Sequence, residues 1–440
     1  TARRFIIATG AKPFVPPIPG LEEVDYLTYE TVWALRELPA RLIVVGAGPA
    51  GNNTALGLAS RGFAVTVIDS RQVIGDKLCT GIVGTECCEA FPIPSELIYR
   101  QANSATFISP NGREFGVVSS RDQALVVDRV AYINEIAETA MNAGASYHLG
   151  HRVSGIEMDD TSVRVRVRTL NNSTIFSAKL LILSSGFGSP LIRMAGLREG
   201  KDGDFMMGAQ TEVEIGNVSD TEVYVGDQIA PEAFGWIVPL DESRAHVGLM
   251  SHHPLNGHLD SFQSRLKERG KILDDISAPR RWGIPLKPIP RTYADRTLVT
   301  GDAAGFAKPT TGGGIYYAML SGQMAAAAAI KAFECGDFSA AQLKGYEDDW
   351  KKVFGHELKV GYYARLLFES MNDTQLDRMM EMFLSPEVQQ DTVLSSDFSF
   401  DWHGKTILKT VRHQELGPLI TSFGAVVAPF FKRLIRSSIF

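Results

Sequence analysis

A glycine-rich segment between two apolar strands constrains the fold of this chain more than any other feature. It reads VVGAGPAG; it ends the apolar, β-branched run RLIVV at 41–45 and precedes a helical pattern that ends at Gly62. A second apolar run, AVTVID at 64–69, follows that pattern. A buried parallel strand, a tight turn, a helix and a second strand make up a βαβ unit. The segment therefore predicts an α/β fold that binds a nucleotide.

Each glycine of this GxGxxG segment has its own task. Gly46 permits the tight turn, Gly48 lets the backbone approach a pyrophosphate, and Gly51 lets the helix pack closely on the strand. The helix N-terminus then offers unpaired N–H groups and the positive end of its dipole to the phosphates. Asp69 ends the second strand, 23 positions after Gly46, where its carboxylate can accept hydrogen bonds from a ribose. These residues suit either FAD or a nicotinamide dinucleotide.

A second loop, far along the chain, favours FAD. In LVTGDAAGFAKPTTGGGIYYAM an apolar strand delivers Gly301 and Asp302, and a new helix follows. An acid at that position can bind ribityl or ribose hydroxyls, and the helix N-terminus can face a phosphate or the flavin pyrimidine. The glycines Gly312, Gly313 and Gly314 allow the backbone to lie against a flat ring. Two loops more than 250 residues apart suit one large ligand that spans both, whereas a nicotinamide domain would not need the second.

Five segments resemble one family of flavoproteins. GDAAGFAKPTTGGGIYYAM closely resembles the corresponding segment of the geranylgeranyl reductase family, which has the fold of p-hydroxybenzoate hydroxylase. Similar to that family, in the same order, are GDKLCTGIVG, VDRVAY, FGWIVPLDESRAHVG and YEDDWKKVFGHELKVG. The resemblance covers about Leu38 to the C-terminus. It implies FAD in the GAGPAG loop and makes Arg129, in VDRVAY, a further cofactor contact.

The same resemblance suggests residues for chemistry and substrate. It implies that Cys79 lies beside the flavin ring as a proton donor or positioning group; the alternative is a small buried hydrophobe. Phe234, Trp236 and Pro239 are expected to line a channel for a long apolar chain. The alternative for these three is sheet core, since alternate positions on a strand share a face. The family pattern has Tyr in place of Phe234 and Phe in place of Val238, so the fine substrate specificity stays open.

The opening stretch resembles a different family. FIIATGAKPFVPPIPG and the residues up to the glycine loop are similar to the ATG segment and interdomain join of pyridine nucleotide-disulfide reductases. Residues 1–37 are therefore expected to be the remnant of an upstream nucleotide-binding domain, within a fragment of a longer polypeptide. Residues 38–338 are predicted to form a discontinuous, Rossmann-like FAD-binding domain with an inserted antiparallel substrate-binding sheet at about 204–290. Residues 339–440 are predicted to be a helical C-terminal region.

Composition excludes several classes of protein. The 440 residues are 45% hydrophobic and carry a net charge of −6, so no basic field would recruit nucleic acid. The four cysteines, Cys79, Cys87, Cys88 and Cys335, match no zinc pattern and no disulfide framework, which indicates a reducing cytoplasm. The histidines of SHHPLNGH are expected to form a polar turn, and no metal site is predicted. No apolar run reaches the roughly 18 residues of a membrane span.

The C-terminus, GPLITSFGAVVAPFFKRLIRSSIF, allows two interpretations. Its apolar residues alternate with Lys432, Arg433 and Arg436, so it could lie in the membrane interface and give access to a lipid. Alternatively, it is a terminal helix that packs on the core. Pro429 interrupts any simple amphipathic helix in this segment.

The resemblance implies an FAD-dependent oxidoreductase that reduces isolated C=C bonds of a geranylgeranyl or polyprenyl group. The substrate class is a lipid, a quinone or a chlorophyll-type precursor, and the electron donor is either NAD(P)H or a ferredoxin-like carrier. Two alternatives share the fold: an FAD-dependent monooxygenase or halogenase, and an electron-relay flavoprotein. Ser185 stands where related hydroxylases have the acid of an Asp-Gly pair, which counts against the monooxygenase.

Overall fold

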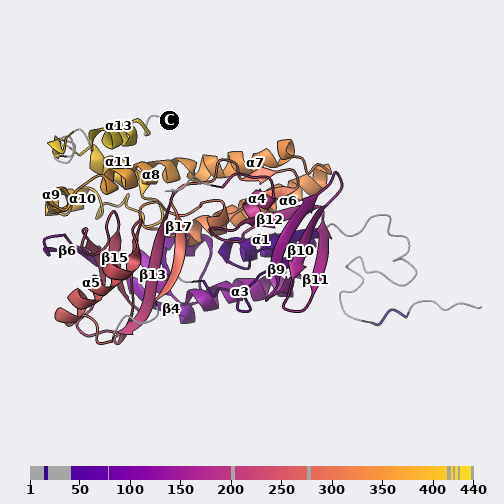
Figure 1. Cartoon of the computed structure of the whole chain (residues 1–440), viewed down its shortest axis with the longest axis horizontal. Coiled ribbons are helices and arrows are strands. Elements are labelled where there is room, and N and C mark those ends of the chain that lie inside the picture. The colour runs from indigo at the N-terminus through magenta and orange to yellow at the C-terminus, as the bar shows by residue number, and fades with distance from the viewer. Residues whose placement is uncertain are drawn as a thin grey trace, which may run out of the picture. The chain divides into compact units, whose positions relative to one another are not determined.

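The computed structural model describes most of the chain after residue 40 (Figure 1). The described residues are 14–17, 41–77, 79–199, 204–274, 279–413, 418–419, 422–424 and 427–437. The chain divides into two units, Thr1–Ala40 and Arg41–Phe440. The predicted upstream remnant, residues 1–37, lies outside the described residues apart from 14–17.

A six-stranded sheet forms the centre of the nucleotide-binding part. Its strands lie in the order β18 (Tyr293–Ala294), β19 (Thr297–Val299), β12 (Leu180–Leu183), β1 (Arg41–Val45), β2 (Ala64–Ile68) and β8 (Ser146–His148). All pairs are parallel except β18 with β19. From Leu42 to Val45 every residue of β1 is buried, as expected of an apolar strand inside a parallel sheet. The predicted βαβ opening is confirmed.

Helices with small side chains pack on this sheet. α1 (Pro49–Ala59) lies against α3 (Arg129–Asn142) and α6 (Ile315–Cys335). α1 and α6 pack closely together: a Cβ on Gly57 would lie only 3.1 Å from the Cβ of Ala326. The short α4 (Leu191–Met194) follows β12, and the 3₁₀ turn η4 (Gly301–Ala303) follows β19. This packing places the N-termini of α1 and α6 beside the same sheet edge.

A seven-stranded sheet lies at the other end of the second unit from the six-stranded sheet (Figure 1). Its order is β17 (Arg280–Pro285), β13 (Phe205–Glu214), β16 (Arg244–Ser251), β15 (Phe234–Pro239), β14 (Thr221–Val225), β5 (Ser104–Ile108) and β6 (Glu114–Val118). Only β14 and β5 are parallel. One face is covered by α5 (Leu255–Glu268), whose Leu259, Phe262 and Leu266 are buried. Five of the strands come from the range 204–290, and two come from a segment about a hundred residues earlier.

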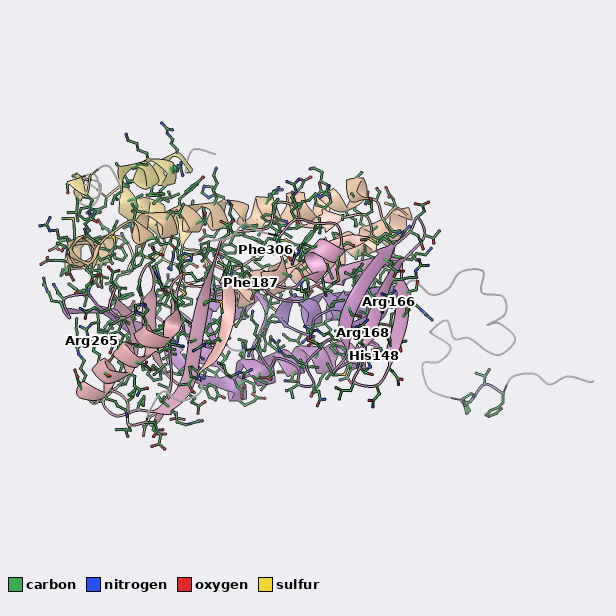
Figure 2. All side chains as sticks on the ribbon, in the orientation of Figure 1. His148, Arg166, Arg168, Phe187, Arg265 and Phe306 are labelled. Carbon is green, nitrogen blue, oxygen red and sulfur yellow. The ribbon has the colours of Figure 1, made fainter. Side chains whose placement is uncertain are left out.

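Two small sheets complete the β structure. β3 (Ile82–Gly84), β7 (Ala124–Val127) and β4 (Ile98–Ala102) form one, and the short α2 (Thr85–Ala90) and the 3₁₀ turn η3 (Ser95–Leu97) connect its strands. The other consists of β11 (Ser173–Ala178), β10 (Val163–Arg168) and β9 (Arg152–Met158). β10 alternates buried valines with exposed arginines, and Arg166 and Arg168 lie on its exposed face (Figure 2).

The chain after residue 339 is helical in its described parts. α7 (Ala340–Trp350) continues through a π-helical turn (Lys351–Gly355) into α8 (His356–Glu369), and Figure 1 shows this rod passing over both large sheets. Then follow α9 (Asp373–Phe383), α10 (Pro386–Asp391), α11 (Gly404–Val411) and α13 (Ala428–Ser437). None of the helices that the structure describes is both long enough and apolar enough to cross a bilayer.

Candidate functional site

The GAGPAG loop has the geometry of a phosphate-binding turn. Gly46 adopts φ +111°, and a Cβ on it would overlap the carbonyl oxygen of Ser184, the residue after β12. A Cβ on Gly51 would overlap the carbonyl oxygen of Gly46, so only glycine lets α1 approach β1 this closely. A Cβ on Gly48 would meet nothing within 4 Å, and this open side faces a cavity. Pro49 begins α1, and the N-cap residue Gly48 has no side chain to cap it, so the helix N-terminus is open to a ligand.

Asp69 lies beside this loop. One carboxylate oxygen accepts the backbone N–H of Ala47 at 2.7 Å, and the other accepts the N–H of Arg71 at 2.7 Å. These bonds hold the carboxylate at the end of β2, on the wall of the cavity. Each oxygen retains acceptor capacity for a ribose hydroxyl, because a carboxylate oxygen has two lone pairs.

The second predicted loop lies on the same cavity. η4 presents Asp302, whose carboxylate forms an ion pair with the Lys77 ammonium. The loop that follows is closed by two hydrogen bonds of 2.8 Å, from Lys308 N–H to the Gly313 carbonyl and from Gly312 N–H to the Lys308 carbonyl. Gly312 has φ +74°, and a Cβ on it would lie 3.1 Å from Ile284 of β17. The backbone of this loop is therefore bare of side chains where it faces β17.

One continuous cavity of about 1190 Å³ joins the two loops. A pocket for a single drug-sized ligand spans about 300–1,000 Å³, so this cavity has room for a dinucleotide and part of a second molecule. The predicted residues that line it are Gly46, Gly48, Asp69, Cys79, Arg129, Phe234, Trp236, Asp302, Gly312, Gly313 and Gly314. Gly51 and Pro239 do not line it.

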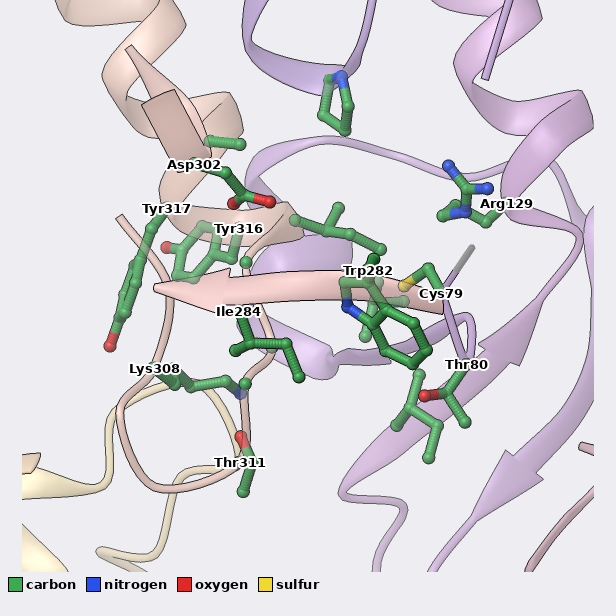
Figure 3. A pocket seen from close by; sticks show the side chains of 18 of the residues that line it. Cys79, Thr80, Arg129, Trp282, Ile284, Asp302, Lys308, Thr311, Tyr316 and Tyr317 are labelled. Atoms are coloured by element: carbon green, nitrogen blue, oxygen red, sulfur yellow. The ribbon is translucent and has the colours of Figure 1, made fainter. Parts of the chain in front are cut away.

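Arg129 and Cys79 occupy the same side of the cavity (Figure 3). Arg129 begins α3, and its guanidinium donates to the backbone carbonyls of Gly75, at 2.7 Å, and of Lys77. It therefore supports the loop that precedes Cys79 as well as lining the cavity. Burial lowers the pKa of this guanidinium. The Sγ of Cys79 accepts the N–H of Gly81 at 3.5 Å, and its side chain is partly exposed to the cavity.

Phe234, Trp236 and Val238 share the cavity face of β15. The rings of Phe234 and Trp236 meet edge to face, with their centroids 6.0 Å apart. Trp236 Nε1 donates to Gln210 Oε1 at 3.1 Å, and Gln210 Nε2 donates to the Cys79 carbonyl at 3.3 Å, so the strand is linked to the cysteine loop. Pro239 lies on the opposite face from Trp236 because side chains alternate along a strand, and Val238 takes the lining position instead.

Apolar side chains from distant segments form the other end of the cavity, the apolar arm. Phe107 and Val117 come from β5 and β6, Val225 from β14, Phe234 from β15, and Met380 and Phe383 from α9. Phe187, on the other wall, lies against β17, where a Cβ on Gly283 would overlap its ring (Figure 2). The apolar side chains of this arm suit a long apolar chain.

Sequence reasoning missed four polar residues at the cavity. Three of them, Lys308, Asp401 and His403, lie close together; Lys308 and Asp401 are buried and His403 is partly buried. Lys308 lies within the second glycine-rich loop, but a lysine followed by proline carries no signal of burial. Asp401 and His403 come from the link before α11, a hundred residues later, where no sequence pattern indicated a site. Arg365 of α8, also buried and on the cavity, was missed for the same reason.

The polar groups fit an extended dinucleotide such as FAD. The open side of Gly48, the carboxylates of Asp69 and Asp302, and the bare loop at Gly312 follow one another along the cavity wall. Ser185 Oγ, also on this wall, is buried and has no hydrogen-bond partner among the described residues, so a ligand polar group would complete it. Within the described part of the chain, no three His, Cys, Asp or Glu side chains come together as metal ligands would.

Two protein families match the chain. The family of FAD dependent oxidoreductases matches residues 42–261, and the family of pyridine nucleotide-disulphide oxidoreductases matches residues 1–82. The chain is 31% identical over 365 residues to the digeranylgeranylglycerophospholipid reductase of Methanocaldococcus jannaschii, covering 77% of this chain and 89% of that protein. It is 29% identical to the enzyme of the same name from Methanoculleus marisnigri, covering 80% and 92%. Both resemblances noted in the sequence are thereby confirmed.

Solved structures share the fold. A geranylgeranyl bacteriochlorophyll reductase-like protein from Thermoplasma acidophilum matches with a TM-score of 0.75 and 24% identity, over 87% of this chain and 100% of that one. The p-nitrophenol 4-monooxygenase PnpA from Pseudomonas putida matches with a TM-score of 0.64 and 18% identity, over 80% and 96%. The predicted fold class, a discontinuous FAD-binding α/β fold with an inserted sheet and a helical C-terminal region, is confirmed. Because a monooxygenase shares it, the fold does not choose the reaction.

Proposed function

Because the chain belongs to the family of FAD dependent oxidoreductases that includes the digeranylgeranylglycerophospholipid reductases, we propose that it reduces isolated C=C bonds of a geranylgeranyl or other polyprenyl group on a lipid. FAD is its cofactor. The observation that carries the proposal is the single cavity of about 1190 Å³, which joins the nucleotide loops to the apolar arm. A prenyl chain bound in that arm would therefore reach the bound cofactor inside the protein.

The residues divide the work between binding and positioning. Gly46, Gly48 and Asp69 would hold the adenosine and pyrophosphate part of FAD, and Asp302 with Gly312–Gly314 would hold its flavin part. Gly51 serves the same site through helix packing, and Arg129 through the loop that it supports. FAD, when bound and reduced, supplies the hydride of the reaction.

The second hydrogen of each reduced bond must come from a proton donor. Cys79 is our candidate, because its Sγ lies on the cavity and its loop is linked to Trp236 through Gln210. The Sγ–H would give its proton to the alkene carbon opposite the one that receives hydride, and solvent would return a proton to the thiolate. Phe234 and Trp236 would orient the chain, and the apolar arm would keep water from the reacting carbons.

Two alternatives share this fold. One is an oxygen-using monooxygenase or halogenase, and the other is an electron-relay flavoprotein. The apolar arm favours the reductase over an electron relay, because a relay needs no channel for a long chain. Ser185, in place of an acid, also disfavours the monooxygenase. The donor of electrons is proposed to be NAD(P)H or a ferredoxin-like carrier.

We further propose that the protein works in a reducing cytoplasm, at the surface of a membrane. Its four cysteines are unpaired in the structure. The apolar residues Phe431 and Leu434 of α13 pack into a core with α8, so this helix is docked on the protein. Its exposed Lys432, Arg433 and Arg436 leave a basic face that could contact anionic lipid headgroups.

The test is mass spectrometry of a prenyl-lipid mixture incubated with FAD-loaded protein and dithionite, which replaces the natural donor. The expected result is a gain of two hydrogen atoms for each reduced double bond. Cys79→Ser should retain FAD and slow the reaction, and Gly48→Ala should serve as the flavin-poor control. No mass change, with flavin shown to be bound and reduced, would contradict the reductase and favour the alternatives.

A further inference from the structure

A buried lysine on the glycine loop has no part in the function proposed so far. We propose that Lys308 is a positioning residue of the flavin site: it holds the loop Gly312–Gly314 in place and sets a fixed positive charge beside it. The consequence is that Lys308 favours reduction of the flavin. This inference rests on the proposal that the loop Gly312–Gly314 holds the flavin part of FAD.

The first support is the shape of the loop. Lys308 is bonded to the loop through its own backbone, by the two 2.8 Å bonds with Gly312 and Gly313. Its side chain then turns back along the same loop, so that a Cβ on Gly313 would lie 3.0 Å from Lys308 Cε and 3.7 Å from Nζ. Figure 3 shows Lys308 and Thr311 close together below Ile284 and Tyr316. The ammonium therefore lies within a few ångströms of the loop backbone.

The second support is the anchor of the ammonium in the helical region. Nζ donates to the carbonyl of Phe400 at 2.7 Å and lies 4.4 Å from the centroid of the Phe400 ring. Asp401 Oδ1 is 3.8 Å from Nζ, and the other oxygen of Asp401 accepts the N–H of Cys87 at 2.9 Å. Next to this anchor, Thr310 Oγ1 and His403 Nδ1 are 2.7 Å apart. Residues 308–310 are thus tied to residues 400–403 at several points.

The third support is the charge of the surroundings. The Lys308 side chain is 8% exposed and that of Asp401 is 3% exposed, so the pair is nearly dry. The other titratable groups that face Lys308 tend toward their neutral forms. Burial raises the pKa of the two carboxyls and of the thiol, and lowers the pKa of the imidazole; these groups are Glu86, Glu357, Cys87 and His403. Burial also lowers the pKa of the Lys308 ammonium, and the nearby Asp401 carboxylate opposes that shift, so the ion pair with Asp401 is what holds the proton on Lys308.

The orientation of this ion pair determines whether the reduction potential of the flavin is raised or lowered. Lys308 is the member on the loop, and both its Cε and Nζ are among the three atoms nearest to the Cβ position of Gly313, whereas Asp401 is farther away. The loop also ends at Gly314, the N-cap of α6, where the helix dipole is positive. A positive charge in a site of low dielectric stabilises electrons added nearby. The lysine should therefore raise the reduction potential of the bound flavin.

The experiment compares the flavin midpoint potential of wild type and Lys308→Met, measured against a redox dye without any lipid. Methionine keeps the length of the side chain and removes the charge. We expect the equilibrium constant for reduction to fall about tenfold, which is about 30 mV for a two-electron couple. Lys308→Arg, which keeps the charge, should stay close to wild type. Lys344→Met, at an exposed lysine of α7 paired with Asp348, is the matched control and should change nothing.

Each outcome separates this inference from the proposed function. If Lys308→Met retains FAD and the wild-type potential, the inference is overturned even if wild type reduces prenyl lipids. If the potential shifts but wild type reduces no prenyl lipid, the proposed function fails and the inference stands. Should Lys308→Met not fold because it leaves Asp401 unpaired, Lys308→Met with Asp401→Asn removes both charges. That double variant should also have a lower potential than wild type, and an unchanged potential would contradict the inference.

Discussion

The two ends of the cavity are built in opposite ways. At the nucleotide end the wall consists of backbone: Gly46, Gly48 and Gly312 present N–H groups or bare Cα atoms, and a single carboxylate lies beside each loop. At the apolar arm the wall consists of side chains such as Phe234 and Met380, which come from strands and helices far apart in the sequence.

This difference teaches where each end tolerates change. A backbone wall needs one residue type at each position, because any Cβ would occupy ligand space or overlap a neighbouring carbonyl. A wall of apolar side chains needs only suitable volume, and methionine or phenylalanine can be exchanged at moderate cost. We therefore expect substitutions at the nucleotide end to abolish binding, and those at the apolar arm to change the choice of substrate. The predictions below test that contrast.

The largest effect is expected for Gly51→Ala. Its Cβ would overlap the carbonyl oxygen of Gly46, so α1 must move away from β1, at a cost of about 3 kcal/mol or more. The measurement is thermal unfolding together with the flavin content of the purified protein, and both should fall. Gly48→Ala is the matched control, since its Cβ meets nothing within 4 Å. Compared as apoproteins, Gly48→Ala and wild type should unfold at the same temperature, although Gly48→Ala binds FAD poorly. Equal unfolding temperatures for the Gly51→Ala and Gly48→Ala apoproteins would break the contrast.

A second effect concerns acid stability through His403. Burial lowers its pKa to about 3 from an ordinary value of 6.5. Between these two values the unfolded chain binds a proton that the folded protein does not bind, so stability falls as the pH drops below 6.5. The slope from this residue approaches about 1.4 kcal/mol per pH unit. His403→Asn should flatten the dependence of the unfolding free energy on pH in that window. A variant as acid-sensitive as wild type would show that other groups cause the slope.

Asp302 tests whether the nucleotide end depends on charge as well as backbone. Asp302→Asn should weaken FAD binding about 100-fold, or about 2.7 kcal/mol, because an amide cannot replace the carboxylate as an acceptor for two hydroxyls. Lys77→Met removes the ion-pair partner and leaves the carboxylate free for the ligand. Fluorescence titration with FAD should therefore find Lys77→Met close to wild type. If both variants lose affinity equally, the ion pair itself supports the site.

The smallest effect is expected at the apolar arm. Phe234→Ala removes an aromatic wall and should raise KM for a prenyl lipid about tenfold, since roughly 1.4 kcal/mol of apolar contact is lost. The affinity for FAD and its midpoint potential should not change. Pro239→Ala, on the other face of β15, should leave KM unaltered. A loss of FAD from Phe234→Ala would mean that the two ends of the cavity are not independent.

The sequence predicted the nucleotide end well because that end is local. The strand–turn–helix around Gly46, the position of Asp69 and the loop at Gly312 each depend on neighbouring residues, and the structure brings all of them onto one cavity. Most of the apolar arm was not predictable, because Phe107 and Met380 meet only through tertiary packing. Pro239 was expected on the cavity from its motif, but the alternation of a strand places it on the other face. Lys308 and Asp401 were missed because neither position carries a local pattern.

The π-helical turn between α7 and α8 limits how this protein can vary in length. At its start, the stacked rings of Trp350 and Phe354 both pack against Phe306, Trp350 tilted and Phe354 edge-on. On the other side, Arg365 donates to the Glu232 carbonyl beside the seven-stranded sheet. Each residue turns an α-helix by about 100°, so gain or loss of one residue in this rod would rotate one contact face away from its sheet. The same change would also move that contact by about 1.5 Å along the helix axis, so the number of residues between Phe306's partners and Arg365 is fixed from both ends.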